Sequence, residues 1–405
     1  MPTPIRLLKI ESPPDALREL DRVGTGGEAR ERLAAKMIPM RIWLGDVRAP
    51  AANILKQEML ALGGDAAVTR GAAACLEPAS PVILTGTLLQ IRRLTRALRD
   101  QPFGLDLLGE RIAAFLQIVA RREFTVKTRR GDLTFGRRTL VMGVVNATPD
   151  SFSDGGRFLD PEAALAHALA LEAEGADVID VGGESTRPGA RPVDAGEEIR
   201  RVVPVIERLA ARVCVPISID TTKARVADAA LQAGASIVNV VGALALDPEV
   251  ADVAAREEAG LVLSHMRGRP ETMDGEARYP RGVTGEVVEE LARAIAEAES
   301  RGVDRERIVV DPGLGFAKDA GHSWEVLRRL EELRTLGRPI LVGTSRKSFI
   351  GKATGLPVGE RFPGDAAALA IAVLHGASMV RVHEVARVLP VLRMAEAIRD
   401  AGEAP

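Results

Sequence analysis

Polar and charged residues recur at a fixed place in this sequence, at or just beyond the end of short apolar runs. Some are carboxylates or amides and others are cations. A carboxylate or amide next to a buried strand needs hydrogen-bond partners, so the recurrence indicates a polar site rather than scattered surface residues. The residues are Asn146, Asp220, Asn239, Asp311, Lys347, Arg381 and His383.

The two kinds of side chain suit two parts of one ligand. Carboxylates and amides match a flat heterocycle with ring N–H and amino groups, because a carboxylate accepts two parallel N–H bonds. Lys347, Arg381, His383 and Arg187 are cationic or become so on protonation, and they suit an anion such as phosphate. A substrate with a heterocycle at one end and phosphate at the other fits both sets.

Several of these residues also have a plain structural interpretation. The Asp-Pro-Gly sequence at 311–313 is compatible with an ordinary turn, and Lys347 with a solvated charge at a helix start. His383 has the alternative of pairing with Glu384 or the backbone. His265 has apolar neighbours, and we interpret it as a structural histidine. Asn239 has no such alternative, since it lies inside the apolar run Ile-Val-Asn-Val-Val.

Eight short apolar runs, each followed by a helical stretch, must position these residues. Near-continuous apolar strands that alternate with helices are typical of a parallel sheet covered on both faces. Eight such units predict a (β/α)₈ barrel, in which the strand ends converge on one mouth. A doubly wound open sheet is the alternative. The predicted strands are 141–146, 178–182, 216–220, 237–241, 261–265, 308–311, 340–343 and 379–383.

The sequence predicts two domains. Residues 1–122 read as a small α/β domain of unknown role, beginning with a strand at 5–10. Residues 123–405 read as the barrel, preceded by a β-hairpin at 124–136. One helix of the first domain, at 87–100, has a basic face, which we interpret as solvated rather than as a nucleic-acid site.

Composition excludes several classes of protein. The chain has 405 residues, 46% of them hydrophobic and 27% charged, as in ordinary globular proteins. A formal net charge of −2 gives no global footprint for nucleic acid. We find no apolar run of about 18 residues and no signal-peptide pattern, so we expect no membrane span and no export. We expect Cys75 and Cys214 to be buried thiols in a reducing cytoplasm.

Seven stretches of this sequence are similar to the motifs of one family. On them the chain, from residue 124 onward, resembles the dihydropteroate synthases of the folate pathway. The resemblance implies a (β/α)₈ barrel that condenses 6-hydroxymethyl-7,8-dihydropterin diphosphate with p-aminobenzoate and releases pyrophosphate. The stretches are 146–156, 180–189, 217–221, 265–266, 311–316, 345–348 and 381–383.

The resemblance also implies roles for single residues. The predicted catalytic residues are Asp311, Lys347 and Arg187. The implied pterin site is Asp220, Asn239, Asp311, Lys347 and Arg381. The implied pyrophosphate site is Asn146, Arg187, Arg381 and His383, with Asn146 also reaching Mg²⁺. The implied p-aminobenzoate site is Thr186, Pro188, Phe316 and Ser345.

The sequence leaves two other functions open. A pterin-binding methyltransferase that uses methyltetrahydrofolate would share the barrel, but would not need Arg187 or the cations near residues 345–347 and 381–383. A non-catalytic paralogue would be supported by Val240, where the family often has Asp, and by the extra N-terminal domain. The resemblance further implies a homodimer and inhibition by sulfonamides. The expected partners are the two small-molecule substrates, with no nucleic acid and no membrane.

Overall fold

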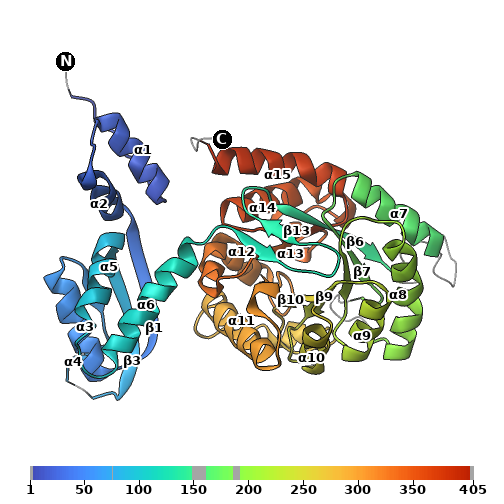
Figure 1. Cartoon of the computed structure of the whole chain (residues 1–405), viewed down its shortest axis with the longest axis horizontal. Helices are drawn as coiled ribbons and strands as arrows, with labels where there is room; N and C mark the ends of the chain where they lie inside the picture. The colour runs from blue at the N-terminus through green and yellow to red at the C-terminus, as the bar shows by residue number, and fades with distance from the viewer. Residues whose placement is uncertain (1–2, 75, 148–160, 186–191, 402–405) are drawn as a thin grey trace. The chain divides into compact units, whose positions relative to one another are not determined.

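The computed structural model describes residues 3–74, 76–147, 161–185 and 192–401 of the chain. They form two compact units, with the boundary between Ala120 and Arg121. We call them the N-terminal unit and the barrel unit (Figure 1).

The N-terminal unit is a three-stranded antiparallel sheet, ordered β1-β3-β2, packed against helices. Its core is aliphatic, with Leu55, Met59 and Leu84 fully buried. The predicted strand at 5–10 is wrong: these residues have no regular structure, and Ile5 and Leu7 are almost fully exposed. The elements are α1 (Pro13–Val23), α2 (Glu28–Met37), β1 (Pro39–Arg48), α3 (Ala49–Ala61), β2 (Asp65–Ala67), α4 (Arg70–Ala73), β3 (Ala79–Thr87), α5 (Leu88–Ala97) and α6 (Leu105–Ala120).

The barrel unit contains an eight-stranded parallel sheet in the order β11-β10-β9-β8-β7-β6-β13-β12. A parallel bridge between Val310 and Ile340 links the two ends of that order and closes the barrel. This confirms the predicted fold class. The strands are β6 (Leu140–Asn146), β7 (Val178–Gly182), β8 (Ile217–Asp220), β9 (Ile237–Val241), β10 (Gly260–Ser264), β11 (Ile308–Asp311), β12 (Leu341–Gly343) and β13 (Met379–Val382).

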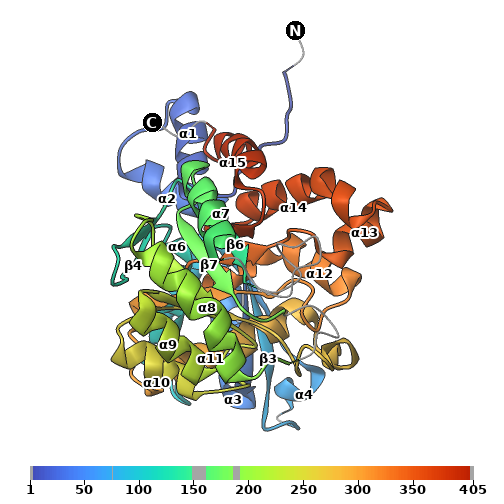
Figure 2. The same ribbon diagram turned by 90° about the vertical axis from the view of Figure 1, so that its right-hand side faces the viewer.

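Helices surround the barrel as an outer layer (Figures 1 and 2). Their apolar faces and the outward faces of the strands form one continuous core. The helices are α7 (Pro161–Ala173), α8 (Ala195–Ala210), α9 (Ala224–Ala233), α10 (Glu249–Arg256), α11 (Val283–Ser300), α12 (Ala320–Arg328), α13 (Ser348–Thr354), α14 (Phe362–Leu374) and α15 (Val385–Arg399), with 3₁₀ turns η1 (Met273–Glu276), η2 (Arg305–Arg307), η3 (Leu330–Leu336) and η4 (Val358–Glu360).

The barrel interior is apolar at one end and polar at the other. A second core joins the first inward-facing residues of the strands, such as Met142 and Val178, to the hairpin of β4 (Phe124–Val126) and β5 (Leu133–Phe135). This hairpin closes the amino-terminal end of the barrel. The polar residues lie toward the carboxyl ends of the strands, as expected for an active-site mouth.

Strand alternation places Val240 away from that mouth. Successive strand residues face opposite sides, so Asn239 faces the barrel interior and Val240 the helices. Val240 is 1% exposed and packs in the core between strands and helices. Val240 therefore belongs to the core between strands and helices and not to the lining of the mouth.

Two further findings concern the cysteines and the length of the helices. Cys214 is exposed in the turn between α8 and β8, so the prediction of a buried thiol is wrong for it, while Cys75 lies outside the described residues. Within the described ranges, every helix is too short or too polar to cross a membrane.

Candidate active site

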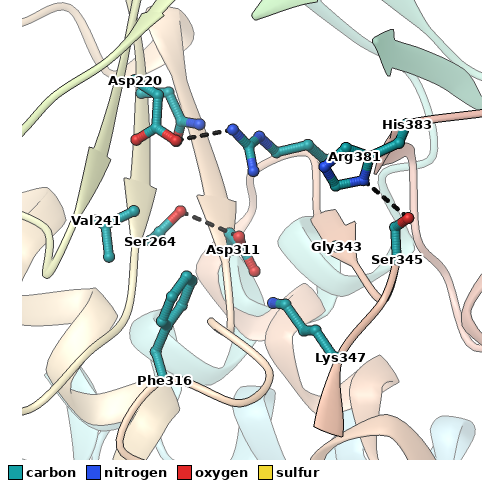
Figure 3. A pocket seen from close by; sticks show the side chains of 11 residues that line it. Asp220, Val241, Ser264, Asp311, Phe316, Gly343, Ser345, Lys347, Arg381 and His383 are labelled. Carbon is teal, nitrogen blue, oxygen red and sulfur yellow. Dashed lines mark hydrogen bonds and ion pairs between the residues drawn. The ribbon is translucent and has the colours of Figure 1, made fainter. Parts of the chain in front are cut away.

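A pocket opens at the carboxyl end of the strands (Figure 3). It brings together eight of the predicted residues: Asp220, Asn239, Asp311, Phe316, Ser345, Lys347, Arg381 and His383. Val241, Ser264 and Gly343 complete its lining. Asn146 ends β6 and is half-buried, but it is not part of this lining. The predicted residues Thr186, Arg187 and Pro188 lie outside the described residues.

Strand register explains why residues distant in sequence meet here. Asp220 on β8 lies beside Asn239 on β9, and Ser264 on β10 lies beside Asp311 on β11. Each is at or near the carboxyl end of its strand, and alternation turns each one inward. The side chains of Asp220, Asn239 and Asp311 are 6%, 2% and 5% exposed. These polar residues therefore rest on strands, while Phe316, Ser345, Lys347 and His383 lie beyond the strand ends.

One side of the pocket is built around the Arg381 guanidinium. Its Nε donates to Asp180 Oδ2 at 2.6 Å and its Nη2 to Asp220 Oδ2 at 2.8 Å. Asp180 Oδ2 also accepts from Asn239 Nδ2 at 3.2 Å. Burial opposes the charge of Arg381, but the two carboxylates more than offset it and hold its pKa above the usual value.

The pKa of Asp220 is unusually high for a carboxyl group. Burial raises the pKa of Asp220 to about 7; the Arg381 guanidinium opposes the shift and the charge of Asp180 adds to it. Asp220 Oδ1 is buried and has no hydrogen-bond partner among the described residues. A buried carboxylate oxygen without a donor is a strong acceptor for a ligand N–H.

Asp311 is held by its neighbours in a defined orientation. Its Oδ2 accepts from Ser264 Oγ at 3.1 Å and its Oδ1 from the Gly313 amide at 2.7 Å. Gly313 has φ +63°, and a Cβ there would lie 1.9 Å from the His265 carbonyl oxygen. Only glycine fits this close approach, so the Asp-Pro-Gly turn is fixed against β10.

Lys347 extends toward Asp311 from the loop after β12 (Figure 3). Its Nζ donates to the Leu314 carbonyl and lies 4.6 Å from the centre of the Phe316 ring. Burial lowers the pKa of Lys347 to about 8, and the charge of Asp311 partly offsets this. Nearby, His383 Nδ1 and Ser345 Oγ are 3.0 Å apart.

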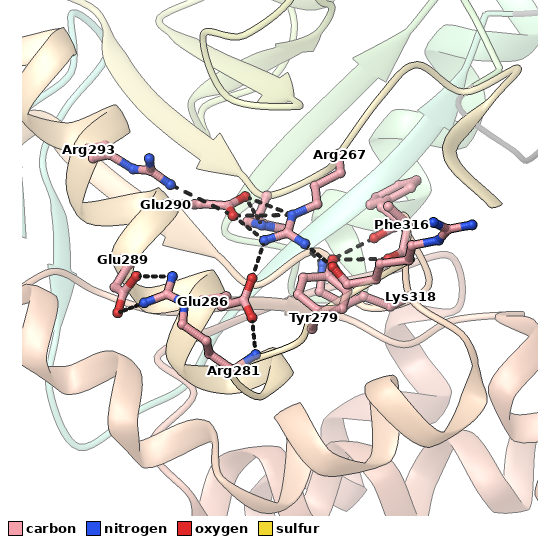
Figure 4. A network of polar contacts seen from close by, with 12 residues as sticks. Arg267, Tyr279, Arg281, Glu286, Glu289, Glu290, Arg293, Phe316 and Lys318 are labelled. Carbon is pink, nitrogen blue, oxygen red and sulfur yellow. Dashed lines mark hydrogen bonds and ion pairs between the residues drawn. The ribbon is translucent and has the colours of Figure 1, made fainter. Parts of the chain in front are cut away.

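A buried chain of polar groups lies behind the Phe316 loop, and Figure 4 shows its outer part. Lys318 Nζ contacts His265 Nδ1 at 2.8 Å and donates to the carbonyls of Gly313 and Phe316. His265 Nε2 lies 2.9 Å from Glu290 Oε2. Burial lowers the pKa of His265 to about 4, with the charge of Lys318 adding to the shift. His265 is thus a neutral structural residue, as interpreted from the sequence.

The loop before α11 is tied to the same chain. Arg267 forms ion pairs with Glu286 and Glu290, and its guanidinium lies 4.1 Å from the centre of the Tyr279 ring (Figure 4). The Tyr279 hydroxyl donates to the Ala317 carbonyl at 3.0 Å. These contacts fix the loop that carries Phe316 from its outer side.

Sequence reasoning missed two residues of the site, Asp180 and Ser264. Both face inward on their strands, and each binds a carboxylate or cation that lines the pocket. The signal was present, since Asp180 is a charged residue within an apolar strand. Asp180 was missed because it lies two residues before the end of β7, whereas the predicted residues were sought at or beyond strand ends. The side chain of His265, one residue beyond β10, turns away to Glu290 and Lys318.

Metal binding by protein side chains alone finds no support in the described part of the chain, where no three His, Cys, Asp or Glu residues gather around one point. Asn146 offers one amide oxygen, a hard ligand of the type that Mg²⁺ accepts. Mg²⁺ commonly keeps its waters and binds through one or two protein groups and substrate phosphates. A single oxygen ligand fits that mode of binding.

Comparisons with known proteins agree with this geometry. Residues 142–383 match the pterin binding enzyme family. The chain is 45% identical to a dihydropteroate synthase of Synechocystis over 265 residues, which are 65% of this chain and 91% of that protein. It is 40% identical over 396 residues to a probable bifunctional folylpolyglutamate synthase/dihydropteroate synthase of Haloferax volcanii. That alignment covers 95% of this chain, the N-terminal unit included, but only 46% of the relative, so the chain spans about half its length.

Solved structures give the same result. A Xanthomonas albilineans dihydropteroate synthase with 4-aminobenzoic acid has a TM-score of 0.62 at 44% identity, covering 68% of this chain and 96% of that one. A Yersinia pestis dihydropteroate synthase in complex with a sulfonamide drug has a TM-score of 0.64 at 37% identity, covering 69% of this chain and all of that one.

Proposed function

This chain belongs to the pterin-binding enzyme family, and from that premise we propose that its barrel unit is a dihydropteroate synthase. It condenses 6-hydroxymethyl-7,8-dihydropterin diphosphate with p-aminobenzoate to give 7,8-dihydropteroate and pyrophosphate. The observation that carries the proposal is the pocket itself. Buried acceptors (Asp220, Asn239, Asp311) and cations (Lys347, Arg381) line one cavity, as a heterocycle joined to a diphosphate requires.

The pterin ring binds against the buried acceptors. Asp220, Asn239 and Asp311 take up ring N–H and amino groups, and each has a carboxylate or amide oxygen of matching chemistry. Lys347 and Arg381 lie beside the ring, donating to its carbonyl and ring nitrogens and facing the diphosphate. Support comes from the polarity of these residues and from their shared pocket.

The arylamine and the diphosphate bind nearer the mouth. Phe316 and Ser345 line the arylamine site together with Thr186 and Pro188, and Arg187, Arg381, His383 and Asn146 hold the pyrophosphate. Phe316, Ser345, Arg381 and His383 share the pocket lining, which supports their part of this assignment. The remaining assignments rest on the family motifs.

We propose Mg²⁺ as the cofactor, held by Asn146 and the diphosphate of the substrate. Bound there, the ion neutralises charge on the leaving pyrophosphate. The hard oxygen of Asn146 and its position at the end of a barrel strand support this role.

The chain's own residues act on charge that develops during the reaction. The C–O bond to the diphosphate breaks first, and the cationic side chains stabilise the departing anion. The positive charge left on the pterin methylene lies near the carboxylates of Asp311 and Asp220, which favour it. The amine nitrogen then forms the C–N bond and loses one proton to solvent. An arylamine is a weak base, so no strong general base is required.

The decisive experiment measures pyrophosphate release by the purified chain with dihydropterin diphosphate and Mg²⁺, with and without p-aminobenzoate. Release coupled to dihydropteroate formation, inhibited competitively by a sulfonamide with respect to p-aminobenzoate, is the expected result. Pterin binding without release would reject the proposal. Methyl transfer from methyltetrahydrofolate to a corrinoid would then be assayed.

We propose further that the protein is a homodimer that acts in the cytoplasm. Apolar side chains of the outer helices α14 and α15 support self-association, because Ile371, Leu374, Met394 and Ile398 are each more than 40% exposed. Sedimentation equilibrium of the full chain, and of a variant with Met394 and Ile398 changed to Ser, tests the dimer. A monomeric wild type would reject it.

A further inference from the structure

We propose that Asp180 is a positioning residue that sets the hydrogen-bond polarity of the heterocycle site. This inference rests on the proposed function and adds a residue to it. Asp180 is fully buried on β7, inside the barrel and beneath the pocket, and it does not line the cavity itself. It acts through Asn239 and Arg381, which do.

Asp180 fixes which end of the Asn239 amide faces it. An ionised carboxylate only accepts hydrogen bonds, so the group that Asn239 presents to Asp180 must be its NH₂. The Nδ2–Oδ2 distance of 3.2 Å agrees. The amide oxygen of Asn239 is thereby left for another donor, and Asn239 Oδ1 is buried with no partner among the described residues. Asp180 thus makes Asn239 an acceptor toward a ligand.

The second step concerns Arg381. The same Oδ2 atom of Asp180 accepts Nε of Arg381, while Asp220 accepts Nη2. Two carboxylates on neighbouring strands therefore hold one guanidinium through two different N–H groups. Since Arg381 has five N–H donors, the bonds to Asp180 and Asp220 direct the remaining donors elsewhere, toward the pocket that Arg381 lines.

The third step concerns the unpaired oxygens. Asp180 Oδ1, Asp220 Oδ1 and Asn239 Oδ1 are all buried without a partner among the residues described. Such atoms are costly to leave unsatisfied, so their concentration at one site indicates that a bound donor satisfies at least those facing the cavity. A heterocycle with adjacent N–H and amino groups supplies such donors.

The test compares Asp180→Asn with the wild type. An amide at 180 has the same shape but also donates, so it no longer dictates which end of Asn239 faces the ligand. We expect the dissociation constant for 6-hydroxymethylpterin, measured by calorimetry, to rise about tenfold or more. We also expect the acid limb of kcat/KM to move to lower pH, because removing the charge of Asp180 lowers the pKa of Asp220. A purely structural role would not move that limb.

Other charged groups near Asp220 stay unchanged in this comparison. They are Arg381 on β13, Glu184 after β7, Glu198 on α8, Lys223 before α9, which forms ion pairs with both glutamates, and Lys347 after β12. Asp177→Asn is the matched control. Asp177 immediately precedes β7 and accepts from Arg138 and the Val141 amide at the far end of the barrel. We expect it to leave the acid limb in place.

The outcomes separate the inference from the proposed function. A wild type that neither binds pterin nor turns over rejects the proposed function. The inference alone is rejected by a different result. In that case the wild type binds pterin and turns over, and the D180N variant folds. The dissociation constant of the variant is within about twofold of the wild type, and its acid limb within about 0.2 pH units, roughly the precision of such titrations. If D180N lacks a cooperative thermal transition, Asp180→Ser, which also removes the charge, is judged by the same two readouts.

Discussion

At the scale of single residues, the site contains two ionisable groups, Asp220 and Lys347, whose burial moves their pKa values toward neutrality. The pKa of Asp220 is shifted upward and that of Lys347 downward, so a carboxyl group and an ammonium that line the same pocket titrate within about one pH unit of each other. Groups of this kind cluster at functional sites because binding and catalysis need charge in a water-poor place.

The first prediction concerns how kcat/KM depends on pH. Below about pH 7 Asp220 is protonated and no longer a full acceptor, and above about pH 8 Lys347 is neutral. The profile of kcat/KM is therefore expected to be bell-shaped, with limbs near these two values. Asp220→Asn should remove the acid limb and leave the basic limb. A flat profile between pH 6 and 9 in the wild type would contradict this assignment.

The second prediction concerns Lys347→Ala. The ammonium lies over Phe316 and beside Asp311, so its loss removes charge stabilisation at the reacting end of the pterin. We expect kcat/KM to fall at least about 100-fold, with the thermal midpoint little changed. Lys352→Ala, on the exposed face of α13, is the control with normal turnover. Arg187→Ala is expected to behave like Lys347→Ala, and near-normal turnover in both would reject their roles.

At the scale of elements, the loop between β11 and α12 is held in place by its own buried lysine. Lys318 Nζ makes three contacts, two to carbonyls of that loop and one to His265. Burial lowers the pKa of Lys318 to about 7, and Asp311 partly offsets the shift. Through these contacts, Lys318 fixes the conformation of the loop that carries Phe316.

The third prediction is that Lys318→Met changes arylamine binding more than chemistry. Methionine is unbranched like lysine and only one atom shorter, but it donates no hydrogen bond, so the loop that carries Phe316 loses its inner hydrogen bonds. The KM for p-aminobenzoate should rise about tenfold, while that for the pterin diphosphate changes less. Steady-state kinetics in both substrates measures this split. Equal rises in both KM values would indicate general damage to the barrel instead.

At the scale of the whole molecule, the chain consists of two units with separate cores. Residues 121–123, between α6 and β4, have no regular structure and are exposed. All the described pocket residues belong to the barrel unit. The N-terminal unit is nevertheless covered by the alignment with the halobacterial relative, so it is a shared feature and not peculiar to this chain.

The fourth prediction is that the barrel unit folds and works by itself. A chain starting at residue 121 is expected to unfold in one cooperative transition and to keep kcat/KM within about threefold of the full chain, since a domain with its own core folds alone. Trypsin should cut the full chain first at Arg121 or Arg122. An insoluble or inactive fragment would show that the N-terminal unit completes the barrel.

The sequence by itself determined the strands of the barrel and indicated the family, although the strand predicted at 5–10 does not form. Local apolar runs define the eight strands to within a residue or two, because strand formation depends on nearby side chains, and the polar residues at their ends were visible as a pattern. Tertiary structure alone decided which of them meet. Arg381 and Asp180 are 201 positions apart, yet share a hydrogen bond. Strand alternation turned Val240 outward and Asp180 inward, and close packing turned His265 toward Lys318. The direction in which a side chain points, and the distant residues that it contacts, depend on the closed barrel and not on any single segment.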